Sequence, residues 1–177
     1  MHIAKVGIVG SGIMGTGIAE VAILSGFEVV LRSRREGSAL ATRAAIEKSV
    51  DRRVERGKLT ADDRDAALTR LVTTSALHDL AGCDLVIEAV FEDRKVKAEV
   101  TAKVQAVVPD VVFGSNTSTL PISSLAETAK DPAKFIGIHF FSPVERMMLV
   151  EIIMGKKTGD AALAMALDFV RAIRKTP

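Results

Sequence analysis

The chain has 177 residues, 48% of them hydrophobic and only 4% aromatic, and it contains neither tryptophan nor tyrosine. That length suits one domain with a core built mainly from Val, Ile, Leu and Ala. The 24 basic and 22 acidic residues are interspersed and leave a net charge of +2. This balance argues against a surface for nucleic acid or for a membrane.

No apolar run approaches the roughly 20 residues that a helix needs to cross a bilayer. The N-terminal segment enters a glycine-rich turn where a secretory signal would continue as an apolar stretch. The single cysteine, Cys83, can form no intramolecular disulfide and is expected to be buried. We therefore expect a cytoplasmic protein, or one from the interior of an organelle whose transit segment is absent, and we expect no metal site.

The front of the chain combines an apolar run (3–9), a glycine-rich turn and a helical pattern (13–26). In the spacing Gly10-x-Gly12-x-x-Gly15, the first glycine permits a tight turn, the second lets backbone approach a pyrophosphate, and the third lets helix and strand pack closely. The helix would direct free N–H groups and a partial positive charge at the ligand. Because a second strand follows at 27–31, the pattern predicts a dinucleotide site that includes Ile13 and Met14; the alternative is an ordinary glycine-rich turn.

Apolar, β-rich runs alternate with helical patterns along the rest of the chain. The expected strands are 3–9, 29–31, 71–74, 85–89, 111–114, 135–140 and 149–153. This alternation is typical of an α/β, Rossmann-type fold with a doubly wound, mostly parallel sheet. The last two runs flank a Ser-Pro turn and predict an antiparallel edge.

A charged insert at 36–70 separates the second and third strands and predicts two helices. Gly57 is expected to end the first helix, and Thr60 with Asp63 to cap the second. Its basic residues are Arg52, Arg53, Arg56 and Lys58. They are most simply a solvated helix face, and the alternative is an anion-binding arm for a phosphorylated substrate.

A histidine and a glutamate occur in the two C-terminal strand-like runs. His139 and Glu151 are equidistant from Glu145, so antiparallel pairing about that centre would place them opposite each other. A carboxylate in this position would fix the imidazole tautomer and raise its basicity. The alternative is a core histidine with an unrelated, solvent-facing Glu151.

Several motifs occur together in one order: Gly10-x-Gly12-Ile13-Met14-Gly15, Val86-Ile87-Glu88-Ala89-Val90-Phe91-Glu92 with Lys95 and Lys97, Ser115-Asn116-Thr117-Ser118, His139-Phe140-Phe141-Ser142-Pro143, and Val150-Glu151. Their order and spacing closely resemble the nucleotide-binding domain of the 3-hydroxyacyl-CoA dehydrogenases. The resemblance covers essentially the whole chain. The glycine motif is shared with many oxidoreductases, whereas the Asn-Thr-Ser and His-Phe-Phe-x-Pro segments are more specific.

The resemblance implies roles for matching positions. His139 would be the general base that takes the 3-hydroxyl proton, Glu151 its orienting partner, and Ser118 a contact to both the substrate oxygen and the nicotinamide end of the cofactor. Further cofactor-side positions would be Ala89, Glu92, Lys97, Asn116 and Ser142. Ser49 and Arg56 fall where the family touches coenzyme A, which strengthens the anion-binding interpretation of the insert.

Three features depart from the family. The acidic residue that usually ends the second strand is replaced here by Ser33-Arg34-Arg35, which can donate to or pair with a 2′-phosphate and favours NADP(H) over NAD(H). Ser142 stands where the family commonly has Asn. The chain also ends at Pro177, where family members enter a helical domain that closes the cleft and forms the dimer, so we expect a truncated form.

The resemblance therefore implies an oxidoreductase that interconverts (S)-3-hydroxyacyl-CoA and 3-ketoacyl-CoA, of short acyl chain, with an acyl carrier protein thioester as a possible substrate form. The parent would be a homodimer, and residues 1–177 alone would bind cofactor but turn over poorly. Two alternatives are another β-hydroxyacid dehydrogenase, which would use a lysine from a following domain, and a non-catalytic structural relative. The His-Phe-Phe-Ser-Pro block argues against the first, and the joint presence of His139, Glu151 and Ser118 against the second.

Overall fold

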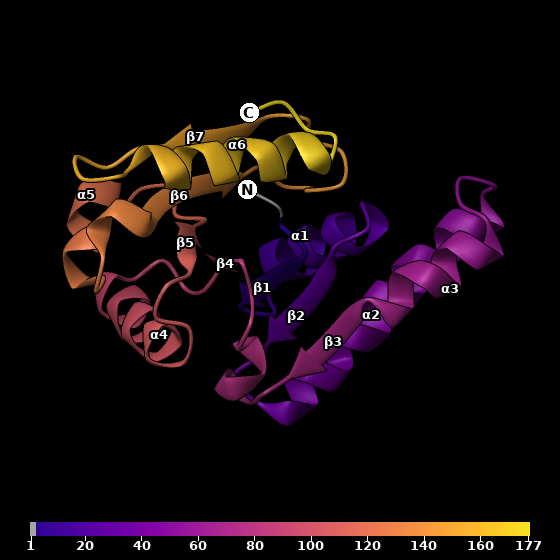
Figure 1. Ribbon diagram of the computed structural model, residues 1–177. Helices are drawn as coiled ribbons and strands as arrows, with labels where there is room; N and C mark the ends of the chain where they lie inside the picture. Colours follow the sequence, from indigo (N-terminus) through magenta and orange to yellow (C-terminus); the bar gives the residue numbers. More distant parts are fainter. Residues whose placement is uncertain (1–2) are drawn as a thin grey trace.

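A computed structural model describes residues 3–177 and shows one sheet flanked by helices (Figure 1). The strands are β1 (Lys5–Val9), β2 (Glu28–Arg32), β3 (Leu71–Thr74), β4 (Leu85–Glu88), β5 (Val112–Ser115), β6 (Phe135–Phe140) and β7 (Val150–Ile153). The helices are α1 (Ile13–Leu24), α2 (Glu36–Glu55), α3 (Ala61–Thr69), α4 (Arg94–Val107), α5 (Ile122–Leu125) and α6 (Asp160–Ala172), with short 3-10 segments η1 (Leu77–Leu80), η2 (Ala126–Thr128) and η3 (Pro132–Lys134).

The strand order is β3-β2-β1-β4-β5-β6-β7, and every neighbouring pair is parallel except β6 and β7. The predicted Rossmann-type sheet and its antiparallel edge are thereby confirmed. The chain leaves β1 toward β2 on one side and reaches β4 on the other. A dinucleotide binds at such a switch point, beside the carboxyl ends of the strands.

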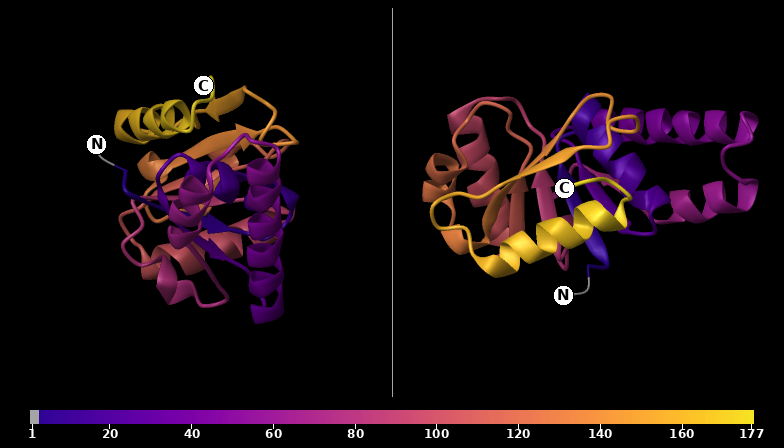
Figure 2. Two further views of the ribbon diagram at one scale, coloured as in Figure 1. Left: turned by 90° about the vertical axis from the view of Figure 1, so that its right-hand side faces the viewer. Right: turned by 90° about the horizontal axis from the view of Figure 1, so that it is seen from above.

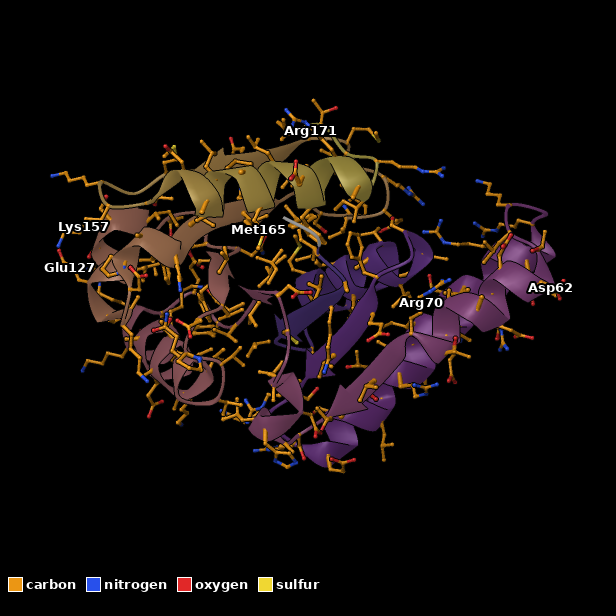
Figure 3. All side chains as sticks on the ribbon, viewed as in Figure 1. Asp62, Arg70, Glu127, Lys157, Met165 and Arg171 are labelled. Carbon is orange, nitrogen blue, oxygen red and sulfur yellow. The ribbon has the colours of Figure 1, made fainter. Side chains whose placement is uncertain are left out.

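The sheet is buried on both faces because its strands are continuous apolar runs. In β4, Leu85 and Ile87 pack into the cluster that contains α1, α2, α3 and α6, whereas Val86 packs into the cluster that contains η1, α4 and α5. This alternation follows from the two-residue period of a strand. Figure 3 shows Met165 of α6 directed toward the interior and Arg171 directed away from it.

Helices α2 and α3 lie side by side and form an arm that projects from the rest of the domain (Figure 2). Helix α2 ends at Glu55, and Gly57 follows its C-cap, Arg56, in the left-handed conformation at φ +65°. The Thr60 hydroxyl accepts from the Asp63 amide at 3.1 Å and caps α3. Both predictions for the insert are confirmed. Arg53 is not the purely solvated side chain that the sequence predicts. Its Nε and Nη2 lie 2.9 Å from the carboxylate of the buried Glu20 in α1.

The boundary of β7 differs from the predicted run by one residue for a structural reason. Leu149 forms a bridge with Thr176 near the C-terminus and not with β6. Cys83 is buried, and burial raises the pKa of its thiol to about 11, so the thiol stays protonated at neutral pH. No helix within 3–177 has both the length and the apolar character for a membrane span.

Candidate active site at the carboxyl edge of the sheet

The three glycines of the turn after β1 have distinct steric environments. Gly10 adopts φ +115°, and a Cβ there would lie 2.5 Å from the carbonyl oxygen of Ala89. A Cβ on Gly15 would lie 1.9 Å from the carbonyl oxygen of Gly10. A Cβ on Gly12 would meet nothing within 4 Å. Gly10 and Gly15 therefore allow close packing of backbone, and Gly12 faces the open space where a ligand can approach.

The N-terminus of α1 is equipped for an anion. Its N-cap is Gly12, which provides no side-chain cap, and its first turn carries no acidic residue. The N–H groups of the first turn are consequently available to a ligand. A groove of about 660 Å³ begins at Ser11 and Gly12 and continues between α1 and α2 to Ser49 and Glu145. These features fit a bound dinucleotide pyrophosphate.

Positive charge gathers just beyond the end of β2. Arg34 and Arg35 are exposed, and the pKa of Arg32 is lowered by partial burial and by the charge of Arg34. Ser33 is fully buried, its amide donates to the Thr74 carbonyl at 2.8 Å, and its Oγ has no hydrogen-bond partner within the described part of the chain. This conformation presents the arginines, and not Ser33, to a ligand at the surface.

A buried ion pair occupies the ends of β4 and β5. The Nζ of Lys97 lies 2.9 Å from each carboxylate oxygen of Glu88, and both side chains are at most 2% exposed. The Ser115 hydroxyl also donates to Glu88. Burial raises the pKa of Glu88, while the Lys97 ammonium and the Ser115 hydroxyl oppose that rise. Lys97 is thus enclosed in the protein, and it can influence the site only through its partners Glu88 and Glu92.

Glu92 lies between this pair and the turn that carries Ser118. One carboxylate oxygen of Glu92 accepts from the amides of Ser118 (3.2 Å) and Thr119 (3.1 Å) and from the hydroxyls of Thr117 and Thr119. The other lies 3.4 Å from the Nζ of Lys97. Partial burial acts to raise the pKa of Glu92, but these hydrogen bonds and the Lys97 charge outweigh it and lower the pKa to about 2. Glu92 is therefore an anion that fixes the Ser118 turn.

His139 and Glu151 face each other across the β6–β7 ladder, as the sequence predicts. The imidazole Nδ1 lies 2.7 Å from the Glu151 carboxylate, and the Phe141 ring packs 4.7 Å from the imidazole between ring centroids. The His139 side chain is 15% exposed and that of Glu151 48%. The Asn116 amide oxygen accepts from the Phe140 amide at 2.8 Å and so joins the end of β5 to the strand that carries His139.

Residues 5–177 match the protein family described as "3-hydroxyacyl-CoA dehydrogenase, NAD binding domain". The chain belongs to this family. It is 44% identical over 173 residues to the 3-hydroxybutyryl-CoA dehydrogenase of Mycobacterium tuberculosis (strain ATCC 25618 / H37Rv), covering 97% of this chain and 60% of the relative. It is 41% identical to the probable 3-hydroxybutyryl-CoA dehydrogenase of Deinococcus radiodurans, covering 98% of this chain and 62% of that relative.

Solved structures agree with this membership. The crystal structure of M. tuberculosis FadB2 superposes with a TM-score of 0.95 at 43% identity and covers 99% of this chain and 63% of that one. The crystal structure of (S)-3-hydroxybutyryl-CoA dehydrogenase PaaH1 from Ralstonia eutropha gives a TM-score of 0.96 at 35% identity, over 99% and 62% of the two chains. The chain thus spans about three fifths of the length of these relatives.

The remaining predicted site residues of this NAD-binding domain lie in two places. Ser142 and Ser118 are exposed beyond the ends of β6 and β5, and Ala89 contributes the carbonyl that approaches Gly10. Ser49 lines the groove between α1 and α2, whereas Arg56 is an exposed residue at the C-terminal end of α2.

Sequence reasoning missed the residues that support these side chains. Thr117 and Thr119 bind Glu92, and Ser115 binds Glu88. The signal was available in part: a glutamate inside the apolar run Leu85–Glu88 needs buried partners. The spacing of the sequence could not show which hydroxyls would supply them.

Proposed function

We propose that this chain provides the cofactor site and the general base of a dehydrogenase that interconverts (S)-3-hydroxyacyl-CoA and 3-ketoacyl-CoA of short acyl chain. The observation that carries this proposal is the His139–Glu151 pair. His139 lies near the carboxyl end of β6, and the glycine turn follows the carboxyl end of β1, so both lie at the same edge of the sheet. The names of the relatives support the substrate class.

The chain's own residues account for binding and proton transfer. Glu151 accepts the Nδ1 proton of His139, which leaves the Nε2 lone pair to take the proton of a 3-hydroxyl group. Ser118, on the turn held by Glu92, would hold the substrate oxygen. The nicotinamide, when bound, would accept or return the hydride. The free N–H groups at the start of α1 would hold its pyrophosphate.

We also propose that the cofactor is NADP(H) in preference to NAD(H). The support is the cluster of Arg32, Arg34 and Arg35 at the end of β2, where the mutual repulsion of Arg32 and Arg34 would be relieved by a 2′-phosphate. Either cofactor satisfies the glycine turn, so the selectivity is a separate proposal from the reaction.

Coenzyme A would lie along the groove between α1 and α2, with Ser49 beside it and Arg56 near its phosphates. An acyl carrier protein thioester would present the same acyl and pantetheine groups. Glu151 is nearly half exposed and the groove is open, so near-attack geometry would need further walls. We therefore propose that residues 1–177 alone bind cofactor but turn over poorly. From the family resemblance alone, we also propose that the whole protein is a homodimer.

The test is the loss of absorbance of reduced cofactor on addition of acetoacetyl-CoA, measured with the whole protein. The proposal predicts rapid oxidation that depends on the thioester. Binding of NADPH or NADH without any turnover would favour a non-catalytic relative. Turnover of a free β-hydroxyacid, with none of the CoA ester, would favour a different dehydrogenase.

A further inference from the structure

Lys175 is a buried cation that the proposed reaction does not use. It is 8% exposed, and its Nζ donates to the carbonyl oxygens of Val144 (2.6 Å) and Met147 (2.7 Å). Within 3–177, no carboxylate lies within ion-pair distance of it. Burial lowers the pKa of Lys175, and the charge of Glu145 partly offsets this effect. A buried charge whose direct hydrogen-bond partners are carbonyl oxygens, with no carboxylate in contact, is unfavourable unless its geometry is well fixed.

The backbone fixes where Lys175 leaves α6. Arg174 adopts φ +59°, the left-handed conformation that often follows a helix. Its amide donates to the Arg171 carbonyl at 2.9 Å, and the amide of Lys175 donates to the Val170 carbonyl at 3.1 Å. This hydrogen-bond pair is the Schellman motif. Lys175 is therefore held rigidly relative to α6.

The partner of Lys175 is the turn that connects β6 to β7. The amides of Arg146 and Met147 both donate to the Pro143 carbonyl, at 3.0 and 3.1 Å. The carbonyls of Val144 and Met147 are then capped by Lys175. Beside it, the Thr176 amide donates to the Met148 carbonyl at 2.9 Å. Side chain and backbone of the C-terminal segment thus hold the same turn.

That turn lies one ladder pair away from the His139–Glu151 pair. The ladder register pairs Phe140 with Val150 where the turn meets the strands, and the next pair is His139 with Glu151. The Val150 amide donates to the Thr176 carbonyl at 2.9 Å. A displacement of the turn would therefore slide Glu151 along the imidazole.

The same turn also touches the cofactor-binding helix. A Cβ added to Gly17 of α1 would lie 2.9 Å from the Val144 side chain, so the turn has little freedom on that side. Lys175 holds it on the other. The turn is thus clamped between α6 and α1, directly beyond the pair that the reaction requires.

We propose that Lys175 is a positioning residue for His139: its ammonium fixes the β6–β7 turn and thereby keeps Glu151 on Nδ1 of the imidazole. The inference rests on the proposed function for its catalytic consequence. Its structural part stands on the hydrogen bonds alone, and a spectroscopic readout can test that part without any turnover.

The first experiment measures the tautomer of His139 in the 177-residue chain, by long-range ¹H–¹⁵N spectra at a pH where the imidazole is neutral. The wild type should show the Nδ1–H tautomer alone. Lys175→Met keeps the aliphatic stem but removes the donors, and it should give a mixture of both tautomers. Lys157→Met is the matched control, because Lys157 extends outward from the loop after β7 (Figure 3), and it should retain the single tautomer.

If Lys175→Met does not fold, Gly17→Ala takes its place, because the added methyl group displaces the turn from the α1 side while Lys175 stays intact. A folded variant of either kind with an unchanged Nδ1–H tautomer overturns the inference. So does a wild-type chain in which the proton resides on Nε2.

The second experiment measures turnover and cofactor affinity in the whole protein. Lys175→Met should lower kcat by about 10- to 100-fold and leave the Kd of the reduced cofactor within about twofold. Unchanged kcat overturns the inference while the proposed function stands. If the wild type itself does not reduce acetoacetyl-CoA, the proposed function fails, and the tautomer measurement still decides the role of Lys175 in positioning.

Discussion

Glu92 is the carboxylate whose stabilising contribution follows most directly from the structure. It accepts from two amides and two hydroxyls of the Ser118 turn and lies close to Lys97. Its pKa lies at about 2, compared with the usual 4.5. That interval corresponds to about 3 kcal/mol, at about 1.4 kcal/mol per pH unit. Because 34% of the side chain is exposed, solvent screening reduces the expected contribution to about 1–2 kcal/mol.

The pH dependence has a definite sign. Folding favours the charged form of Glu92, so its stabilisation is fully present above pH 4.5 and is lost as the pH falls toward 2. Glu92→Gln should therefore be destabilised at pH 7 by about 1–2 kcal/mol, and its deficit relative to wild type should fall by more than half at pH 3.

The assay is urea denaturation of wild type and variant at both pH values, with equal m-values required for the comparison. Glu99→Gln is the matched control. Glu99 lies in α4, the helix that begins two residues after Glu92, is 72% exposed and pairs with Lys103 only at 3.8 Å, so its loss should cost less than about 0.5 kcal/mol. A Glu92→Gln deficit as small as that of the control, or one that is the same at pH 7 and pH 3, would refute the reasoning.

Three further predictions concern the cofactor turn and the end of α6. Arg34→Ala combined with Arg35→Ala should raise the Kd of NADPH about tenfold, about 1.4 kcal/mol, and barely change that of NADH; fluorescence titration tests this, and tenfold tighter NADH binding by the wild type would contradict it. Gly15→Ala should lower the free energy of unfolding by at least about 2 kcal/mol and abolish cofactor binding, because its Cβ would lie 1.9 Å from a carbonyl oxygen. Its control is Gly37→Ala, in open space on α2, which should raise the free energy of unfolding by about 0.5–1 kcal/mol in the same urea denaturation experiment. Arg174→Gly should stabilise the chain by about 1 kcal/mol, because glycine adopts φ +59° without strain, and a lower Tm would show that the arginine side chain contributes more than its backbone costs.

Local patterns sufficed to predict the sheet and the paired histidine. The strands could be predicted because buried parallel strands are continuous apolar runs. The pairing of His139 with Glu151 could be predicted because a hairpin that is symmetric about Glu145 leaves one register. Thr60 and Asp63 interact across three residues, a separation that the sequence shows directly.

The supporting contacts depend on tertiary packing and could not be predicted. Glu92 binds hydroxyls 25 and 27 residues away, and Arg53 binds Glu20 across 33 residues. Many exposed glutamates and arginines compete for such partners in the sequence. The same limit applies to Lys175, whose acceptors are backbone carbonyls and carry no sequence signal.

His139 provides the most direct test of the central claim that its imidazole is the base of the reaction. In the whole protein, His139→Gln should lower kcat with acetoacetyl-CoA by about 10²- to 10⁴-fold and leave the Kd of the reduced cofactor within about twofold. Turnover at the wild-type rate, or a loss of turnover that merely follows a loss of cofactor binding, would contradict the account.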